Sequence, residues 1–202
     1  VTALCAAMGA PTEVSGAAHL PPFAAKTQGY STSITALRLE GFAPSVAGRL
    51  DQLETMLKDM APMARLDAPD SQQLWRAIRD VVPFAYPREK ILWKISVAPT
   101  AGPKIAETVA RAHDAEALFD WSGGLVWLAL DPCPGAGAAL IRQAVADNGG
   151  GNATLIRAPG EMRAETPVFD PQPQGLASLS RRLKAAFDPY AILEPRRMWA
   201  EF

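Results

Sequence analysis

The second half of this 202-residue chain alternates two kinds of segment in an order that few folds accommodate. Four short segments rich in aliphatic and aromatic residues are predicted to be β-strands, at residues 91–97, 115–121, 125–130 and 152–157. Two longer segments carry apolar residues at helical spacing, at 102–113 and 136–147. Ser122, Gly123 and Gly124 predict a tight turn between the second and third strands. The predicted order is therefore β-α-β-β-α-β.

That order is typical of a ferredoxin-like unit, in which helices pack on one face of an antiparallel sheet. The first half predicts a less complete version of the same pattern. Its elements are strands at 13–20, 33–40 and, weakly, 63–66, with helices that begin at Pro44 and at Asp70 or Ser71. We therefore expect an α+β fold, an antiparallel sheet with helices mainly on one face. One extended sheet and two abutting halves both satisfy the pattern.

The last part of the chain has a different character. Residues 158–174 contain four prolines and are expected to form an irregular arm. A final helix is predicted at 175–187, and Asp188-Pro189 ends it. The tail that follows carries several large apolar side chains, which favour docking over fraying. They are Ile192, Leu193, Met198, Trp199 and Phe202.

Composition and charge exclude several classes of function. A formal net charge of −1 lacks the positive charge that binding to nucleic acids or anionic membranes requires. No apolar run reaches the roughly 18 residues of a membrane span. The only cysteines, Cys5 and Cys133, are far apart, so a reducing cytosol is the expected compartment. Val1 opens the chain inside a predicted helix at 2–8, and we expect the chain to be a piece of a longer protein.

Two kinds of motif that often carry chemistry are weak here. His19 and His113 have no second ligand at helical or strand spacing, so structural roles are expected for both. The run at 135–139 lies between a strand and a helix, as a dinucleotide-binding loop does, but it lacks the third glycine and the downstream acidic residue. The glycines at 149–151 follow a helix, whereas a phosphate-binding loop precedes one.

Polar side chains on the predicted strands are the better candidates for a site. In 91–97, Trp93 and Ile95 face one side, and Lys94 and Ser96 face the other. Arg38 lies on the more polar side of the strand at 33–40. Arg and Lys on an uncovered sheet face bind carboxylates or cofactor anions, so Arg38, Lys94 and Ser96 are candidate substrate-binding residues. The alternative is that these are ordinary solvent-facing strand positions.

The C-terminal segment RRLKAAFDPYAILEPRRMWAEF resembles the end of FAD-linked oxidases of the vanillyl-alcohol-oxidase type. That family ends in a helix, a Lys-x-x-Phe-Asp-Pro run and then Leu-Asn-Pro-Gly followed by Arg or Lys. Three segments earlier in the chain, EVSGAAHLP, LRLEGF and LWKISVAPT, are similar to one member of this family, the FAD-binding E subunit of bacterial glycolate oxidase. The tail positions that match are Lys184, Phe187, Asp188, Pro189, Leu193, Pro195 and Arg197.

The resemblance implies that the tail lies near a flavin, with Glu194, Arg196 and Arg197 as candidate cofactor-binding residues. Two of these positions depart from the family pattern. Glu194 stands where the family has Asn, and Arg196 stands where it has Gly. A carboxylate at 194 either disfavours a reduced, anionic flavin or pairs with one of the neighbouring arginines.

The resemblance also implies a division of labour. The 202 residues correspond to the C-terminal cap domain, which roofs the flavin and shapes the substrate pocket, while a separate N-terminal domain binds the FAD diphosphate. The implied reaction is oxidation of a small 2-hydroxy acid such as glycolate to a 2-oxo acid. Electrons then pass to a partner, with a second flavin subunit and an iron–sulfur subunit as the implied neighbours. The implied location is the cytoplasm, with membrane association through those partners, and the cap domain alone is expected to be inactive.

Two alternatives stay open. The protein is a non-catalytic assembly subunit, whose flavin is structural or absent. Otherwise it is a free-standing ferredoxin-like module that binds a ligand or regulates a partner.

Overall fold

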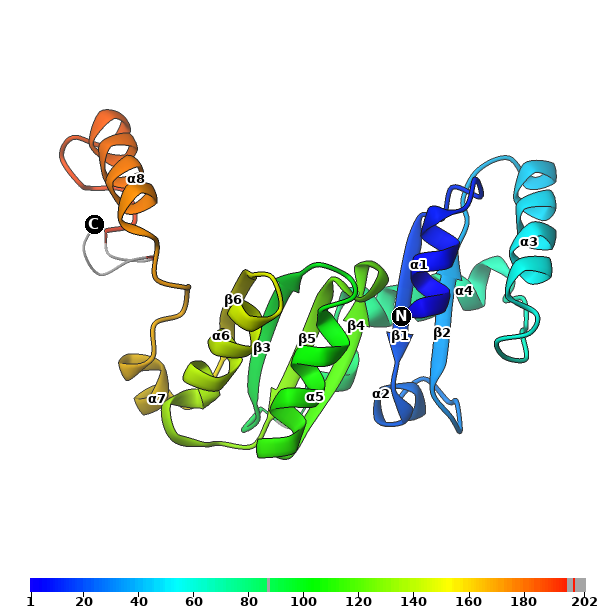
Figure 1. Ribbon diagram of the computed structural model, residues 1–202, viewed down its shortest axis with the longest axis horizontal. Coiled ribbons are helices and arrows are strands. Elements are labelled where there is room, and N and C mark those ends of the chain that lie inside the picture. The colour runs from blue at the N-terminus through cyan, green and yellow to red at the C-terminus, as the bar shows by residue number, and fades with distance from the viewer. Residues whose placement is uncertain (87, 196–197, 199–202) are drawn as a thin grey trace.

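The computed structural model describes residues 1–86, 88–195 and 198 and has an α+β fold. One antiparallel sheet of six strands runs through the described chain in the order β2-β1-β4-β5-β3-β6 (Figure 1). The strands are β1 (Gly16–Leu20), β2 (Ile34–Arg38), β3 (Ile91–Val97), β4 (Ala115–Asp120), β5 (Leu125–Leu130) and β6 (Gly151–Arg157). The expected α+β class and antiparallel sheet are confirmed, and the two halves share one sheet. They meet where β1 pairs with β4 at His19 and Phe119.

The described residues also form α-helices and three short 3-10 turns. The helices are α1 (Thr2–Gly9), α2 (Pro22–Lys26), α3 (Ala43–Leu57), α4 (Ala68–Arg79), α5 (Gly102–Ala112), α6 (Ala138–Asp147), α7 (Gly160–Glu165) and α8 (Gln174–Phe187). The 3-10 turns are η1 (Val82–Phe84), η2 (Trp121–Gly123) and η3 (Pro134–Gly137). No helix in the described ranges is long and apolar enough to cross a membrane.

The order β3-α5-β4-β5-α6-β6 matches the predicted β-α-β-β-α-β pattern, and its strand arrangement is compatible with a ferredoxin-like unit. Helices α5 and α6 lie side by side on one face of these strands (Figure 1). We call this the α5–α6 face. The opposite face carries Lys94, Ser96 and Trp127, and we call it the Lys94 face.

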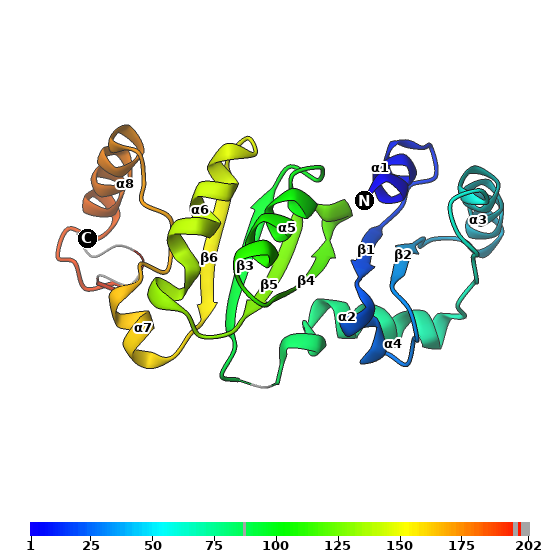
Figure 2. The same cartoon turned by 60° about the horizontal axis from the view of Figure 1, so that its bottom comes forward.

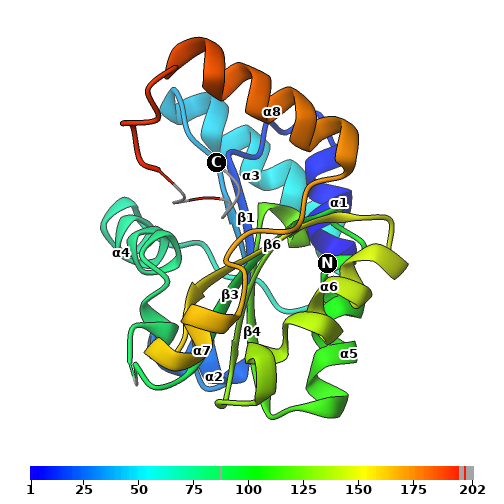
Figure 3. The same cartoon turned by 90° about the vertical axis from the view of Figure 1, so that its left-hand side faces the viewer.

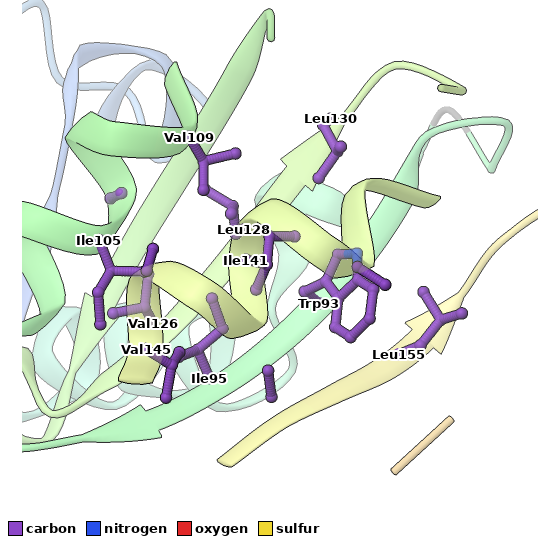
Figure 4. Close-up of a cluster of buried hydrophobic side chains, with 14 of the residues drawn as sticks. Trp93, Ile95, Ile105, Val109, Val126, Leu128, Leu130, Ile141, Val145 and Leu155 are labelled. Atoms are coloured by element: carbon purple, nitrogen blue, oxygen red, sulfur yellow. The ribbon is translucent and has the colours of Figure 1, made fainter. Parts of the chain in front are cut away.

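The main core lies between the α5–α6 face and its two helices (Figure 4). Trp93 and Ile95 of β3 are fully buried there, and Ile105 of α5 and Ile141 of α6 close the cluster from above. The Trp93 indole N–H donates a hydrogen bond of 2.9 Å to the Ala136 carbonyl, so its polar atom is satisfied. The alternation that places Trp93 and Ile95 inward is the one predicted for this strand.

Part of the Lys94 face is also covered. Helix α4 lies across the sheet from α5 and α6 (Figure 3), and with α2 it covers the end formed by β2, β1 and β4 (Figure 2). Leu74 and Ile78 of α4 pack with Leu118 of β4 in a second buried cluster. On β6, at the other end of this face, Ile156 is 39 % exposed, so this edge is uncovered.

Three predictions about individual elements are wrong. Residues 63–66 form no strand, because Met63 and Leu66 are exposed and have no pairing partner in the sheet. The arm at 158–174 contains the short helix α7, which packs through Met162 against the main core. The side chain that caps α4 is Asp67, whose carboxylate accepts a hydrogen bond from the Asp70 backbone N–H. Pro at the first turn suits a helix, so Pro69 does not delay its start to residue 70.

Candidate functional site

Three strands end along the same side of the sheet, on the Lys94 face. Strands β2, β4 and β3 run in the same direction, because each pair is separated by one antiparallel strand. Their C-terminal residues therefore lie at the same end of the sheet. Arg38 ends β2, Asp120 ends β4, and Ser96 is the penultimate residue of β3. The cross-strand register places Asp120, Leu125 and Ser96 in one row.

Lys94 lies two residues before Ser96 on the same face, and its positively charged ammonium group lies near two aromatic rings. It is opposite Trp127 of β5, and its ammonium nitrogen is 5.8 Å from the Trp127 ring centroid and 5.9 Å from that of Trp121. Within the part of the chain that the structure describes, Lys94 forms no ion pair. Lys90, just before the same strand, instead pairs with Glu116 at 3.1 Å and with Asp131 at 3.8 Å. Lys94 therefore has a half-buried positive charge that an external anion can neutralise.

Trp121 reaches Lys94 from a strained turn. Trp121 and Ser122 have φ values of 50° and 62°, which side chains rarely adopt. The turn is held in place by the glycines that follow it, since an added Cβ at Gly124 would lie 2.9 Å from the Val97 carbonyl oxygen. Strain at such residues costs about 1–3 kcal/mol each. An exposed cation–π contact stabilises by only about 0.5–1 kcal/mol, so the Lys94 contact does not offset the strain.

Asp120 fixes the start of this turn. Its carboxylate accepts a hydrogen bond of 2.7 Å from the Trp121 backbone N–H. Burial raises the pKa of Asp120, and the hydrogen bond from the Trp121 N–H and the positive charge of Arg38 partly oppose that shift. Asp120 thus interacts with the Trp121 turn through a hydrogen bond and with Arg38 at the end of β2 through its charge.

Arg38 shares this face but is already neutralised. Its guanidinium lies 5.1 Å from the Trp75 ring centroid on α4 and 3.2 Å from the Glu40 carboxylate. It also donates hydrogen bonds to the Ser15 hydroxyl and carbonyl oxygens. Four strand spacings separate β2 from β3, which is roughly 19 Å. The structure therefore brings Lys94 and Ser96 together and separates Arg38 from them.

The C-terminal tail is ordered by a polar network rather than by docking. The buried Asp188 carboxylate accepts hydrogen bonds from Lys184 and from the backbone N–H groups of Ile192 and Leu193. Lys184 also donates to the Leu193 carbonyl, which folds the tail back onto the end of α8. Ile192, Leu193 and Met198 remain exposed, so the expected docking of these three side chains is wrong, and Trp199 and Phe202 lie outside the described residues.

The predicted cofactor-binding residues lie far from the Arg38 end of the sheet. Glu194 is exposed, with a φ of 44°, and follows the network around Asp188. Helix α8 stands beyond β6, at the opposite end of the molecule from β2 (Figures 1 and 2). Arg196 and Arg197 lie outside the described residues.

Other polar features are explained by the fold. The His19 imidazole shares a hydrogen bond of 2.9 Å with the Thr35 hydroxyl, and burial lowers its pKa. The Gly135-Ala136-Gly137 turn receives the Trp93 indole N–H at Ala136, and a Cβ at Gly137 would crowd Leu130 at 3.2 Å. A hollow of about 450 Å³ between α3 and the segment that follows β2 is lined mostly by apolar residues, and its Arg65 is paired with Asp51 and Glu54. Across the described ranges, no His, Cys, Asp and Glu side chains cluster to hold a metal ion.

The aromatic part of the site was not predicted from the sequence. Trp121, Trp127 and Asp120 come from β4, β5 and their connection, whereas Lys94 comes from β3. The alternation of side chains along each strand was the available signal. Antiparallel pairing places directly opposite residues, such as Lys94 and Trp127, on the same face of the sheet.

Comparisons with protein-family models, with curated proteins and with solved structures find no match for this chain.

Proposed function

We propose that this chain is the cap domain of an FAD-dependent oxidoreductase that oxidises a 2-hydroxy acid to a 2-oxo acid. The observation that carries the proposal is the Lys94 ammonium, which lies 5.9 and 5.8 Å from the ring centroids of Trp121 and Trp127 and has no ion-pair partner among the described residues. A carboxylate is the anion that every 2-hydroxy acid offers. The colinear resemblance to FAD-linked oxidases supplies the reaction type.

The residues present fit the ring end of FAD and not its diphosphate. The Lys94 face offers the half-buried ring of Trp127 and the exposed ring of Trp121, surfaces suited to a planar, partly charged group. In the glycine turn before α6, the Ala136 N–H donates to the Cys133 carbonyl and the Ala138 N–H donates to the Gly135 carbonyl, and the other glycine run follows α6 at its C-terminal end. Phosphate binding requires free N–H groups at a helix N-terminus, so the proposal assigns the diphosphate to another domain.

A bound flavin would supply the acceptor for the hydride from the substrate α-carbon, and the substrate hydroxyl group would release its proton to solvent. In the proposal, Lys94 binds the substrate carboxylate through its ammonium group. Ser96, two residues along the same face, donates or accepts a hydrogen bond at the substrate oxygens. Trp127 excludes water from this charge pair, which strengthens it. The resemblance implies that a second flavin subunit and an iron–sulfur subunit would accept the electrons.

The decisive experiment uses the complete reading frame that contains these residues, expressed together with its neighbouring genes. A visible spectrum of the purified protein should show a flavin band, and anaerobic addition of 2-hydroxy acids, glycolate among them, should bleach it. A full-length protein without a flavin band contradicts the proposal and favours the assembly subunit. A flavin band that no 2-hydroxy acid bleaches contradicts the substrate assignment.

A further inference from the structure

We infer that the Lys94 site selects carboxylic acids whose side chain is aromatic, in preference to glycolate. This inference rests on the proposed function for its reaction and deepens it by naming the substrate class. It comes from the indole ring of Trp121, which stands 59 % exposed beside the ammonium group of Lys94.

The position of the ammonium group dictates where the rest of an acid lies. The Lys94 nitrogen is almost equidistant from the Trp121 and Trp127 rings, at 5.9 and 5.8 Å. A carboxylate bound to that nitrogen therefore lies near both indoles, and the remainder of the acid can reach their exposed surface. Glycolate has only a hydroxymethyl group to place there, which leaves the Trp121 ring wet. An aromatic side chain stacks on the indole and buries apolar surface of both partners.

The exposed Trp121 ring has no evident role in stability, in contrast to the ring of Trp93. Trp93 is buried and donates its indole N–H to Ala136, so its role in stability is complete. Trp121 instead has positive φ and contributes no buried surface to any of the three core clusters. Its backbone N–H is held by Asp120, and the next residues are locked by the close packing of Gly123 against Pro99. The turn at Trp121–Gly123 thus holds an exposed aromatic ring in a fixed position. The ammonium group of Lys94, which has no ion-pair partner among the described residues, lies within reach of that ring.

The test compares two acids on one enzyme. With the complete flavoprotein, kcat/KM is measured for 3-phenyllactate and for glycolate by anaerobic flavin reduction. The expected wild-type ratio favours phenyllactate at least tenfold. Trp121→Ala should lower that ratio at least tenfold, and Trp121→Phe, which keeps a platform, should stay within about threefold of the wild type.

A matched control separates the platform from the general loss of a ring. Phe42→Ala removes a side chain that is 77 % exposed and lies beside α3, away from Lys94, and should leave the ratio unchanged. A wild-type preference for glycolate, or an unaltered ratio in Trp121→Ala, overturns the inference.

A binding measurement decides the inference even where turnover is absent. Calorimetric titration with phenylacetate and with acetate needs no hydroxyl group and no flavin chemistry. Tighter binding of phenylacetate that both Lys94→Met and Trp121→Ala abolish supports the aromatic site. If the protein shows this binding but oxidises no 2-hydroxy acid, the proposed function is contradicted and the aromatic binding site stands. Equal binding of the two acids overturns the inference whatever the flavin does.

Discussion

Successive residues of β3 serve two very different surroundings. Trp93 and Ile95 enter a closed core beneath α5 and α6, where the indole N–H has its acceptor at Ala136. Lys94 and Ser96 lie on the opposite face, where the ammonium group has aromatic neighbours but no carboxylate among the described residues. Polar groups in a core need partners, since burial without one is costly. The contrast therefore separates the face that stabilises the fold from the face that can bind.

The largest expected effect tests the stabilising face. Trp93→Ala should lower the free energy of unfolding by about 3–5 kcal/mol, because it removes a fully buried ring and leaves a cavity. Trp127→Ala, on the Lys94 face, should cost only about 1–2 kcal/mol, because that ring is half-buried. Urea unfolding followed by circular dichroism measures both. Equal losses for the two variants would show that the faces do not differ in this way.

The second prediction compares the two lysines around this strand. Lys94→Met should weaken binding of 3-phenyllactate about 10- to 100-fold, because a hydrogen bond to a charged group contributes about 1.5–3 kcal/mol. It should change the unfolding free energy by about 1 kcal/mol at most, since no ion pair is lost and only the cation–π contacts with Trp121 and Trp127 go. Lys90→Met is the matched control.

Lys90→Met removes the pairs with Glu116 and Asp131, which are partly exposed, so about 1 kcal/mol of stability should go. Ligand binding should stay as in the wild type. If calorimetry finds that the Lys90 variant loses binding and the Lys94 variant does not, the site has been placed on the wrong lysine.

The third prediction concerns the strained turn at the edge of the Lys94 face. Glycine adopts positive φ without the steric penalty that other residues meet. Trp121→Gly should therefore be about 1 kcal/mol more stable than Trp121→Ala, although alanine is the better residue in most regular structure. Thermal unfolding of the two variants measures this difference. An alanine variant at least as stable as the glycine variant would remove the argument from strain.

The sequence predicted what depends on local periodicity and missed what depends on distant partners. The facing of Lys94 and Ser96 followed from period-two alternation within one strand. The same alternation put Arg38 and Glu40 on one side, so their ion pair was within reach of the sequence argument. The tight turn at Ser122, Gly123 and Gly124 was predicted and is confirmed, but the positive φ of Trp121 was not predicted, because it depends on glycines packed against the end of β3. Similarly, α4 has a clear apolar stripe, but nothing local says which face of the sheet receives it.

The smallest expected effects are two opposite pH dependences, one on each side of the sheet. His19 lies beside Phe119 of the main core, and burial holds its pKa below the ordinary value of about 6.5. The unfolded chain therefore takes up this proton first, so stability falls as the pH drops below about 6.5. Asp120 is shifted the other way, since burial raises its pKa. Its contribution is complete below about pH 3.9 and is lost as the pH rises through the raised value.

Removing each group should therefore stabilise the protein in a different pH window. His19→Gln should raise the melting temperature at pH 5 relative to the wild type and have little effect at pH 8. Asp120→Asn keeps an oxygen that accepts the Trp121 N–H, and should raise the melting temperature at pH 7 but not at pH 3. Melting curves across this pH range give both comparisons. If the two variants showed the same dependence of melting temperature on pH, burial would not disfavour a positive charge at His19 and a negative charge at Asp120. The two faces would then not differ in their electrostatics.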